Sequence, residues 1–162
     1  MQPAPKLAPV VPVPSPDPDY RLEAQIGHLL RRAHQRHAAL FEKGLGDLDL
    51  TPTQFAALVK ISDRGEVSQN LLGRLTAMDP ATIQGVIQRL MARGLIERRP
   101  DPADRRATLL RLTDAGTNLA REAVARAKAV TQATLEPLPA AERDTLLKLL
   151  RKLADLPDAG KS

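Results

Sequence analysis

The chain has 162 residues, of which 43% are apolar, and a formal net charge of +5. This length and apolar content suffice for about one domain with its own core, without disulfides or a structural metal. The chain has no cysteine, which excludes thiol catalysis, cysteine-ligated zinc and cysteine-based peroxide sensing, and the cytosol is the favoured compartment.

Most of the net charge lies in residues 89–111, which hold seven arginines and three acidic residues and therefore carry a net charge of +4. Such a concentration suits an element that contacts phosphate groups, although a solvated surface face can also carry it. Tyr20, Phe41 and Phe55 are the only aromatic residues. Because single-stranded nucleic acid is usually bound by stacking on several aromatic side chains, a nucleic-acid partner is expected to be double-stranded.

No apolar stretch approaches the length of a membrane span, so we expect a soluble, cytoplasmic protein without membrane contact. Residues 1–19 hold seven of the 14 prolines. This pattern excludes a secretory signal and predicts a disordered or polyproline-like tail, and residues 157–162 are expected to form a second tail.

Helical periodicity begins at Tyr20. Apolar residues at steps of three and four predict one helix of about 20 residues that stops before Gly44. The stripe consists of Leu22, Ile26, Leu29, Leu30, Ala33, His37, Leu40 and Phe41. The run Thr51-Pro52-Thr53-Gln54 then supplies an N-cap, a first-turn proline and a capping-box glutamine, and predicts a second helix to about Asp63.

Two short helices follow. Ser68 is a suitable N-cap for a helix that ends near Ala77, and Asp79 with Pro80 starts the next helix, which Gly94 ends. The predicted buried stripe of this next helix is Ile83, Ile87, Leu90 and Met91. Two short helices with a tight turn between them are typical of a helix-turn-helix, whose second helix can enter a major groove.

Beyond Gly94 the pattern is that of strands. Residues 95–99 and 108–112 predict a β-hairpin with a charged tip at residues 100–106. Thr113 can cap a long helix, and a leucine-rich helix follows Pro139. The expected fold class is mainly α with a small β-hairpin wing.

Three segments carry a resemblance to a known family: residues 90–98 (LMARGLIER), 101–106 (DPADRR) and 112–116 (LTDAG). In this order and spacing they closely resemble the MarR family of bacterial transcriptional regulators, over about residues 20–156. The resemblance implies a winged helix-turn-helix with N- and C-terminal dimerisation helices, in an obligate homodimer bound to palindromic double-stranded DNA. The long apolar final helices are compatible with a dimer, and packing within one chain is the alternative.

The expected domain organisation follows from this resemblance. It comprises a Pro-rich tail (1–19), a first dimerisation and ligand-pocket helix (20–50), a winged helix-turn-helix (51–113), C-terminal dimerisation helices (114–156) and a short tail (157–162).

The predicted recognition helix has an outward face. With Ile83 turned toward the core, the outward residues are Ala81, Gln84, Gly85 and Gln88. Because glutamine can pair with adenine through two hydrogen bonds, Gln84 and Gln88 are predicted to read bases, and Ala81 is available to a thymine methyl. Gly85 costs about 1 kcal/mol relative to Ala inside a helix. Close approach to DNA or tight packing against the neighbouring helix would each explain it.

Other residues are predicted to position the protein on the DNA backbone. Thr82 and Arg89 lie on the flank of the recognition helix and suit phosphate contacts. Ser68 and Pro80, at the starts of the two short helices, complete the DNA-binding set on these helices.

The wing is predicted to reach the minor groove. The resemblance implies that Asp104 and Arg106 pair with each other while Arg106 enters this groove, where a narrow width concentrates negative potential. Arg105 is expected to contact phosphate. Arg98 and Arg99 are either further DNA contacts or simply strand surface.

The resemblance also implies control by a small molecule. Arg31, His34 and His37 on the first helix would suit an aromatic or phenolic carboxylate, while a hydrogen-bonded core histidine is the alternative for His37. The spacing of His34 and His37 would also permit a metal-responsive site, but without cysteine or an obvious carboxylate partner we expect no metal. No cofactor is expected.

An enzyme is not expected, because the sequence has no Gly-rich phosphate loop, no nucleophile with a base nearby and no metal motif. The predicted function is a sequence-specific transcriptional regulator, a repressor released by a small aromatic effector. A DNA-binding protein without an effector and a protein-interaction module are the competing classes.

Overall fold

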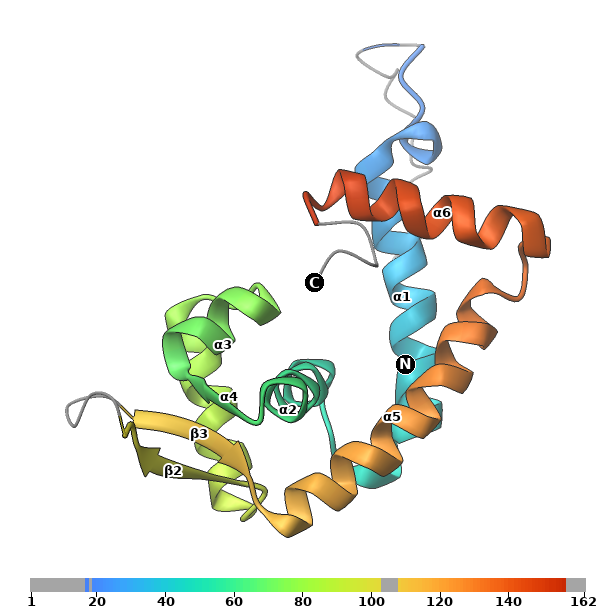
Figure 1. Ribbon diagram of the computed structural model, residues 1–162. Coiled ribbons are helices and arrows are strands. Elements are labelled where there is room, and N and C mark those ends of the chain that lie inside the picture. The colour runs from blue at the N-terminus through green and yellow to red at the C-terminus, as the bar shows by residue number, and fades with distance from the viewer. Residues whose placement is uncertain (1–16, 18, 103–107, 157–162) are drawn as a thin grey trace, which may run out of the picture. The chain divides into compact units, whose positions relative to one another are not determined.

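The computed structural model of the chain describes residues 17, 19–102 and 108–156 (Figure 1). In chain order its elements are the 3-10 helix η1 (Leu22–Ala24), α1 (Ile26–Leu45), the 3-10 helix η2 (Gly46–Leu48), α2 (Pro52–Arg64), β1 (Glu66–Ser68), α3 (Gln69–Thr76), α4 (Pro80–Ala92), β2 (Ile96–Pro100), β3 (Thr108–Leu112), α5 (Asp114–Leu135) and α6 (Ala140–Leu153). The chain divides into two compact units, Met1–Gln35 and Arg36–Ser162. The predicted mainly α fold with a small wing is confirmed.

The predicted helix starts are confirmed by their capping side chains. The Thr51 hydroxyl accepts a hydrogen bond from the Gln54 backbone N–H at 3.2 Å, and the Gln54 side chain accepts one from the Thr51 N–H at 3.0 Å. This reciprocal pair is a capping box. The Ser68 and Thr113 hydroxyls each accept from the backbone N–H three residues on, at 3.3 and 3.1 Å. These caps satisfy N–H groups that the helix itself leaves unpaired.

The bounds of the first helix differ from the prediction. Leu22 lies in η1, and Gln25, in an extended conformation, separates it from α1. At the other end α1 continues through Gly44 to Leu45. A Cβ at position 44 would lie 2.7 Å from Val130 Cγ2. Gly44 therefore allows α1 to pack closely on α5, and it does not end the helix.

The core of the second unit lies among α2, α3, α4 and the sheet, together with the end of α1 and the buried side of α5. Its largest fully buried side chains are Leu45, Leu58, Ile61, Val67, Leu72, Val86, Ile87, Leu90 and Leu110. The predicted burial of Met91 is wrong, since its exposed fraction is 36%, whereas that of Val86 is 1%. The buried stripe of α4 follows helical steps from Ile83 through Val86 to Leu90, and Met91 falls beyond its edge.

The wing hairpin is confirmed and belongs to a larger sheet. The strand order is β1-β3-β2, with both pairs antiparallel. β1 was not predicted, because three residues are too few to display alternation. Its pairing of Val67 with Leu110 places both side chains in the core.

The two C-terminal helices differ in burial. α5 buries Gly116, Ala120, Ala123, Val130 and Leu135, whereas α6 buries no residue. None of the helices in the described ranges is long and apolar enough to cross a membrane.

Candidate nucleic-acid interface

α3, a tight turn and α4 form the predicted helix-turn-helix. Ala77 ends α3 in the left-handed conformation, with φ 52°. Gly73 lets the turn fold back on α3, because a Cβ there would lie 3.3 Å from the Met78 carbonyl oxygen. α4 begins soon afterwards at Pro80, so residues 77–79 alone connect the two helices.

The outward face of α4 carries the residues predicted to read bases. Ala81, Gln84 and Gln88 are exposed, while Ile83, Val86, Ile87 and Leu90 anchor the opposite side in the core. Neither glutamine side chain bonds to another residue in the part of the chain that the structure describes. The buried stripe thus anchors α4 in the core, while the side-chain amide groups of the two glutamines stay available for hydrogen bonds to another molecule.

The start of α4 is fixed by Asp79. Its carboxylate accepts hydrogen bonds from the backbone N–H groups of Ala81 and Thr82, at 3.0 and 2.9 Å, and from the Thr82 hydroxyl. The Thr82 bonds, followed by that from Ala81, hold the pKa of Asp79 below its ordinary value. The hydroxyl hydrogen of Thr82 is therefore used by the cap. Pro80 and Arg89 are both exposed, and Arg89 has no bonded partner within the described ranges.

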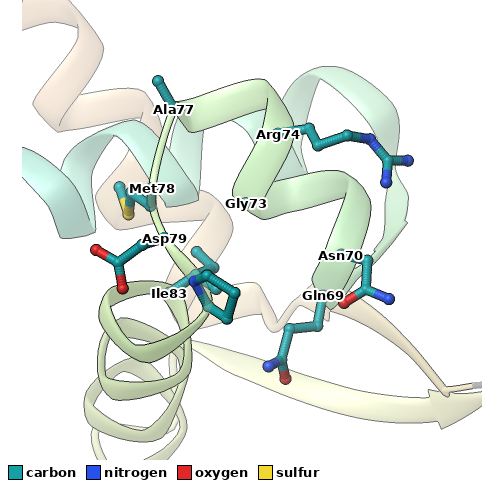
Figure 2. Close-up of a pocket in the computed structure, with 9 residues that line it drawn as sticks. Gln69, Asn70, Gly73, Arg74, Ala77, Met78, Asp79 and Ile83 are labelled. Atoms are coloured by element: carbon teal, nitrogen blue, oxygen red, sulfur yellow. The ribbon is translucent and has the colours of Figure 1, made fainter.

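A groove of about 500 Å³ lies between α3 and α4. In Figure 2, Gln69, Asn70 and Arg74 come from α3, Asp79 from the turn before α4, and Ile83 from α4. Sequence reasoning missed the three α3 side chains. Asn70 and Arg74 are exposed and one turn apart, a phase opposite the buried Leu72 that could have identified them. Ser68, half-buried at the start of α3, acts as its cap.

The wing carries part of the basic stretch. Asp104, Arg105 and Arg106 lie outside the described residues. On strands β2 and β3, the Glu97 carboxylate accepts from Arg111 Nε at 2.5 Å and from Arg99 Nε at 3.2 Å. Arg111, and then Arg99, holds the pKa of Glu97 below its ordinary value. Arg99 thus belongs to an ion-pair cluster on the sheet surface, and the exposed Arg98 points to the other face.

The effector candidates all lie on α1. Arg31 and His34 are exposed, and Arg31 Nη2 lies 3.3 Å from His28 Nδ1. His37 is half-buried, with its ring centroid 6.4 Å from that of Phe41.

A hydrogen-bond chain orients the His37 ring. The Thr134 hydroxyl donates to the Val130 carbonyl at 2.8 Å and lies 3.0 Å from His37 Nδ1. Because a hydroxyl has one hydrogen, Thr134 must accept from His37, so Nδ1 carries the proton. In the neutral ring, Nε2 is then a hydrogen-bond acceptor. The described residues contain no cluster of three or more His, Cys, Asp or Glu side chains that could hold a metal ion.

Residues 48–107 match the model of the MarR family. The transcriptional repressor NicR of Pseudomonas putida is 42% identical over 136 residues, which cover 84% of this chain and 86% of NicR. The chain belongs to the MarR family. It is therefore a winged helix-turn-helix transcriptional regulator that binds DNA, and its relatives are regulators rather than enzymes.

Two solved structures connect this fold with DNA and with a ligand. One concerns the regulation of DNA binding of Bordetella bronchiseptica BpsR by 6-hydroxynicotinic acid. It is 45% identical, covers 85% of this chain and 99% of its own, and has a TM-score of 0.80. The other is a variant of Escherichia coli MarR complexed with operator DNA. It is 28% identical, covers 79% of this chain and 92% of its own, and has a TM-score of 0.74.

Proposed function

We propose that this regulator is a cytoplasmic repressor whose homodimer binds an inverted repeat in double-stranded DNA and is released by a small aromatic carboxylate. The observation that carries the DNA-binding part is the outward face of α4, where exposed glutamine amides stand on a helix anchored by a buried stripe. Each α4 would enter a major groove, with Gln84 and Gln88 reading adenines and Ala81 against a thymine methyl.

The remaining contacts would be to the DNA backbone and the minor groove. Arg89 is proposed to bind phosphate, and Ser68, Pro80 and Thr82 are proposed to lie against the DNA backbone and fix the register of α4. On α3, Asn70 and Arg74 add polar groups at the edge where the first helix of such a motif crosses the phosphates. In the wing, Arg106, directed by Asp104, would enter the minor groove, while Arg105 contacts phosphate.

A homodimer is supported by apolar surface that one chain leaves uncovered. Large exposed apolar side chains cluster in residues 20–30 and 149–156. In the second cluster, Leu149, Leu153 and Leu156 have exposed fractions of 57%, 64% and 60%. Soluble monomers rarely expose such contiguous patches. A second copy of the chain would cover them and would place two recognition helices on one palindrome.

The effector class is proposed from α1 and from the relatives. BpsR responds to 6-hydroxynicotinic acid, a hydroxylated aromatic acid. In this chain the Arg31 guanidinium and His34 would bind the carboxylate of such a compound, and His37 Nε2 would accept a hydrogen bond from its ring hydroxyl or N–H. The orientation of His37 by Thr134 supports this division of roles.

The test is a mobility shift with a duplex selected from a random library by the wild-type protein. We expect 6-hydroxynicotinic acid or a related aromatic acid to release the duplex, and His37→Leu to bind DNA normally but resist release. For a tenfold loss of DNA affinity, the effector must bind the conformation that does not fit DNA about 1.4 kcal/mol more tightly than the conformation that does. Selective DNA binding that no aromatic acid alters would favour a regulator without an effector, and release by zinc would favour a metal-responsive one.

The division of roles on DNA is tested by three single variants. Gln84→Ala and Gln88→Ala should each relax the preference at particular base pairs, at a cost of about 1–3 kcal/mol. Arg106→Ala should weaken binding across many sequences. Since four residues of helix span about 6 Å, the two glutamines should affect positions roughly two base-pair steps apart. Equal losses on all sequences from all three variants would contradict this assignment.

A further inference from the structure

Glycine is the poorest helix former except proline, so a physical reason for a glycine inside a helix can be sought in its surroundings. Three α-helical glycines have such a reason inside this chain. A Cβ would lie 2.7 Å from Val130 Cγ2 at Gly44, 3.3 Å from the Met78 carbonyl oxygen at Gly73, and 1.9 Å from the Leu95 carbonyl oxygen at Gly116. At Gly44 and Gly116 a side chain would force neighbouring atoms to shift, and at Gly73 it would make an unusually tight contact with the backbone of the turn.

Gly85, in the middle of α4, has no such reason. The nearest atom that a Cβ there would meet is Arg89 Nη1, at 3.8 Å, which is ordinary van der Waals contact with the end of a flexible side chain. The explanation by tight packing against the neighbouring helix is therefore wrong. The free protein would accept alanine at this position, and by helix propensity it would be more stable.

The position of Gly85 on α4 indicates that a binding partner, rather than another part of this chain, excludes a side chain there. It lies on the outward face of α4, directly after Gln84, three residues before Gln88 and four residues after Ala81. Positions 81 and 85 thus form a shallow strip, one helical turn long, beside the two glutamines. We infer that Gly85 is itself a DNA-contacting position, whose missing Cβ lets the backbone of α4 approach the base edges closely enough for both glutamines to bond. This inference rests on the proposed function.

A small displacement of α4 away from the DNA would be enough to break the hydrogen bonds of the two glutamines. A methyl group at position 85 would project about 1.5 Å from the Cα atom. Hydrogen bonds from amide groups form over a window of only about 2.7–3.2 Å. A helix lifted from the base edges by even a part of the methyl length would lose the two-bond geometry at Gln84 and Gln88. The phosphate contacts, made by longer side chains, would adjust.

The test is Gly85→Ala, measured for thermal stability and for DNA affinity. We expect Tm to rise by about 2–4 °C, because alanine favours the helix and meets no close neighbour. Affinity for the duplex selected by wild-type protein should fall on the order of tenfold, while affinity for random duplex stays unchanged. Gly85→Leu, also a good helix former, should lose more of the selective affinity.

Gly27→Ala is the matched control. Position 27 is a helical glycine at which a Cβ would meet nothing within 4 Å, and it lies on α1, away from the recognition helix in the sequence. In a preparation with the oligomeric state of wild type, Gly27→Ala should keep the ratio of selective to random affinity.

A Gly85→Ala protein that melts at a lower temperature, or one that melts higher and keeps its selective affinity, would overturn the inference. If wild-type protein selects no sequence at all, the proposed function fails and the inference falls with it. If wild type selects a duplex and Gly85→Ala binds it equally well, only the inference fails.

Discussion

α4 and α6 are helices of similar length, 13 and 14 residues, yet α4 buries four residues and α6 buries none. The apolar stripe of α4 is completed within the chain, by contacts with α2, α3 and β2. Its polar side stays exposed and is the side proposed to contact DNA. α6 instead exposes Leu149 and Leu153 to solvent. The comparison teaches that the apolar side of α4 is covered within its own chain, whereas the apolar side of α6 is left exposed, as the proposed dimer requires.

α5 runs between these two regions. At its start Gly116 lies against Leu95, the residue before β2, and near its middle Arg126 bonds to Asp47. Near its end Thr134 bonds to His37 of α1. These contacts hold α5 to the rest of the chain from its start to near its end. The exposed apolar side chains that distinguish α6 from α4 therefore begin only after α5.

The largest expected effect comes from the uncovered side of α6. Placing two carboxylates on it, by Leu149→Asp with Leu153→Asp, should abolish the dimer, because charges at the centre of an apolar interface are not solvated. Affinity for a palindromic duplex should then fall by at least about 100-fold, since two half-sites no longer bind as one unit. Sedimentation and a mobility shift measure the two effects.

Lys148→Glu is the control for this prediction, because Lys148 is an exposed residue on the polar side of the same helix. It should leave the oligomeric state unchanged. A double aspartate variant that remains dimeric would show that α6 is not an interface, and the contrast with α4 would then have another cause.

A second prediction concerns the junction of α5 with the winged helix. Gly116→Ala should destabilise the fold by roughly 2 kcal/mol or more, because its Cβ would lie 1.9 Å from the Leu95 carbonyl oxygen and backbone atoms must move. Tm measured by circular dichroism checks this. Since Gly85→Ala makes the same chemical change inside α4 and is expected to raise Tm, the two variants together separate helix propensity from packing. Equal shifts of Tm in the two would refute the packing argument.

The sequence predicted what is decided locally. Thr51, Ser68, Asp79 and Thr113 each cap a helix within three residues of themselves, so their signal needs no knowledge of distant parts. The hairpin was predicted for the same reason. The face of α4 that carries Gln84 and Gln88 followed from helical periodicity alone.

What the sequence could not give depends on residues far apart in the chain. The role of Gly44 is set by Val130, and the orientation of His37 by Thr134, 97 residues away. Nothing in the local pattern distinguishes a glycine that ends a helix from one that allows close packing. For Gly85 the sequence left two explanations open, and the neighbours of the missing Cβ exclude one of them.

The smallest expected effect tests a polar contact of α5. The Asp47 carboxylate accepts hydrogen bonds from Arg126 Nη1 at 2.6 and 2.8 Å, and Arg126 holds the pKa of Asp47 below its ordinary value of 3.8. A carboxyl with a depressed pKa in the folded state stabilises the fold above its unfolded pKa, and this contribution disappears as the pH falls through the folded pKa. Asp47→Asn should therefore lower Tm slightly at pH 7, by at most about 2–4 °C.

The pH dependence of Tm and a neighbouring variant sharpen this prediction. The difference in Tm between wild type and Asp47→Asn should be constant from pH 7 to about 5 and should shrink below about pH 4, as the carboxyl becomes protonated. Asp49→Asn is the control on the same segment, because the side chain of Asp49 is 94% exposed and lies 4.0 Å from Arg93. It should change Tm less. A pH-independent difference for Asp47→Asn would mean that its ion pair with Arg126 does not stabilise the fold, and that packing alone holds α5 to the loop before α2.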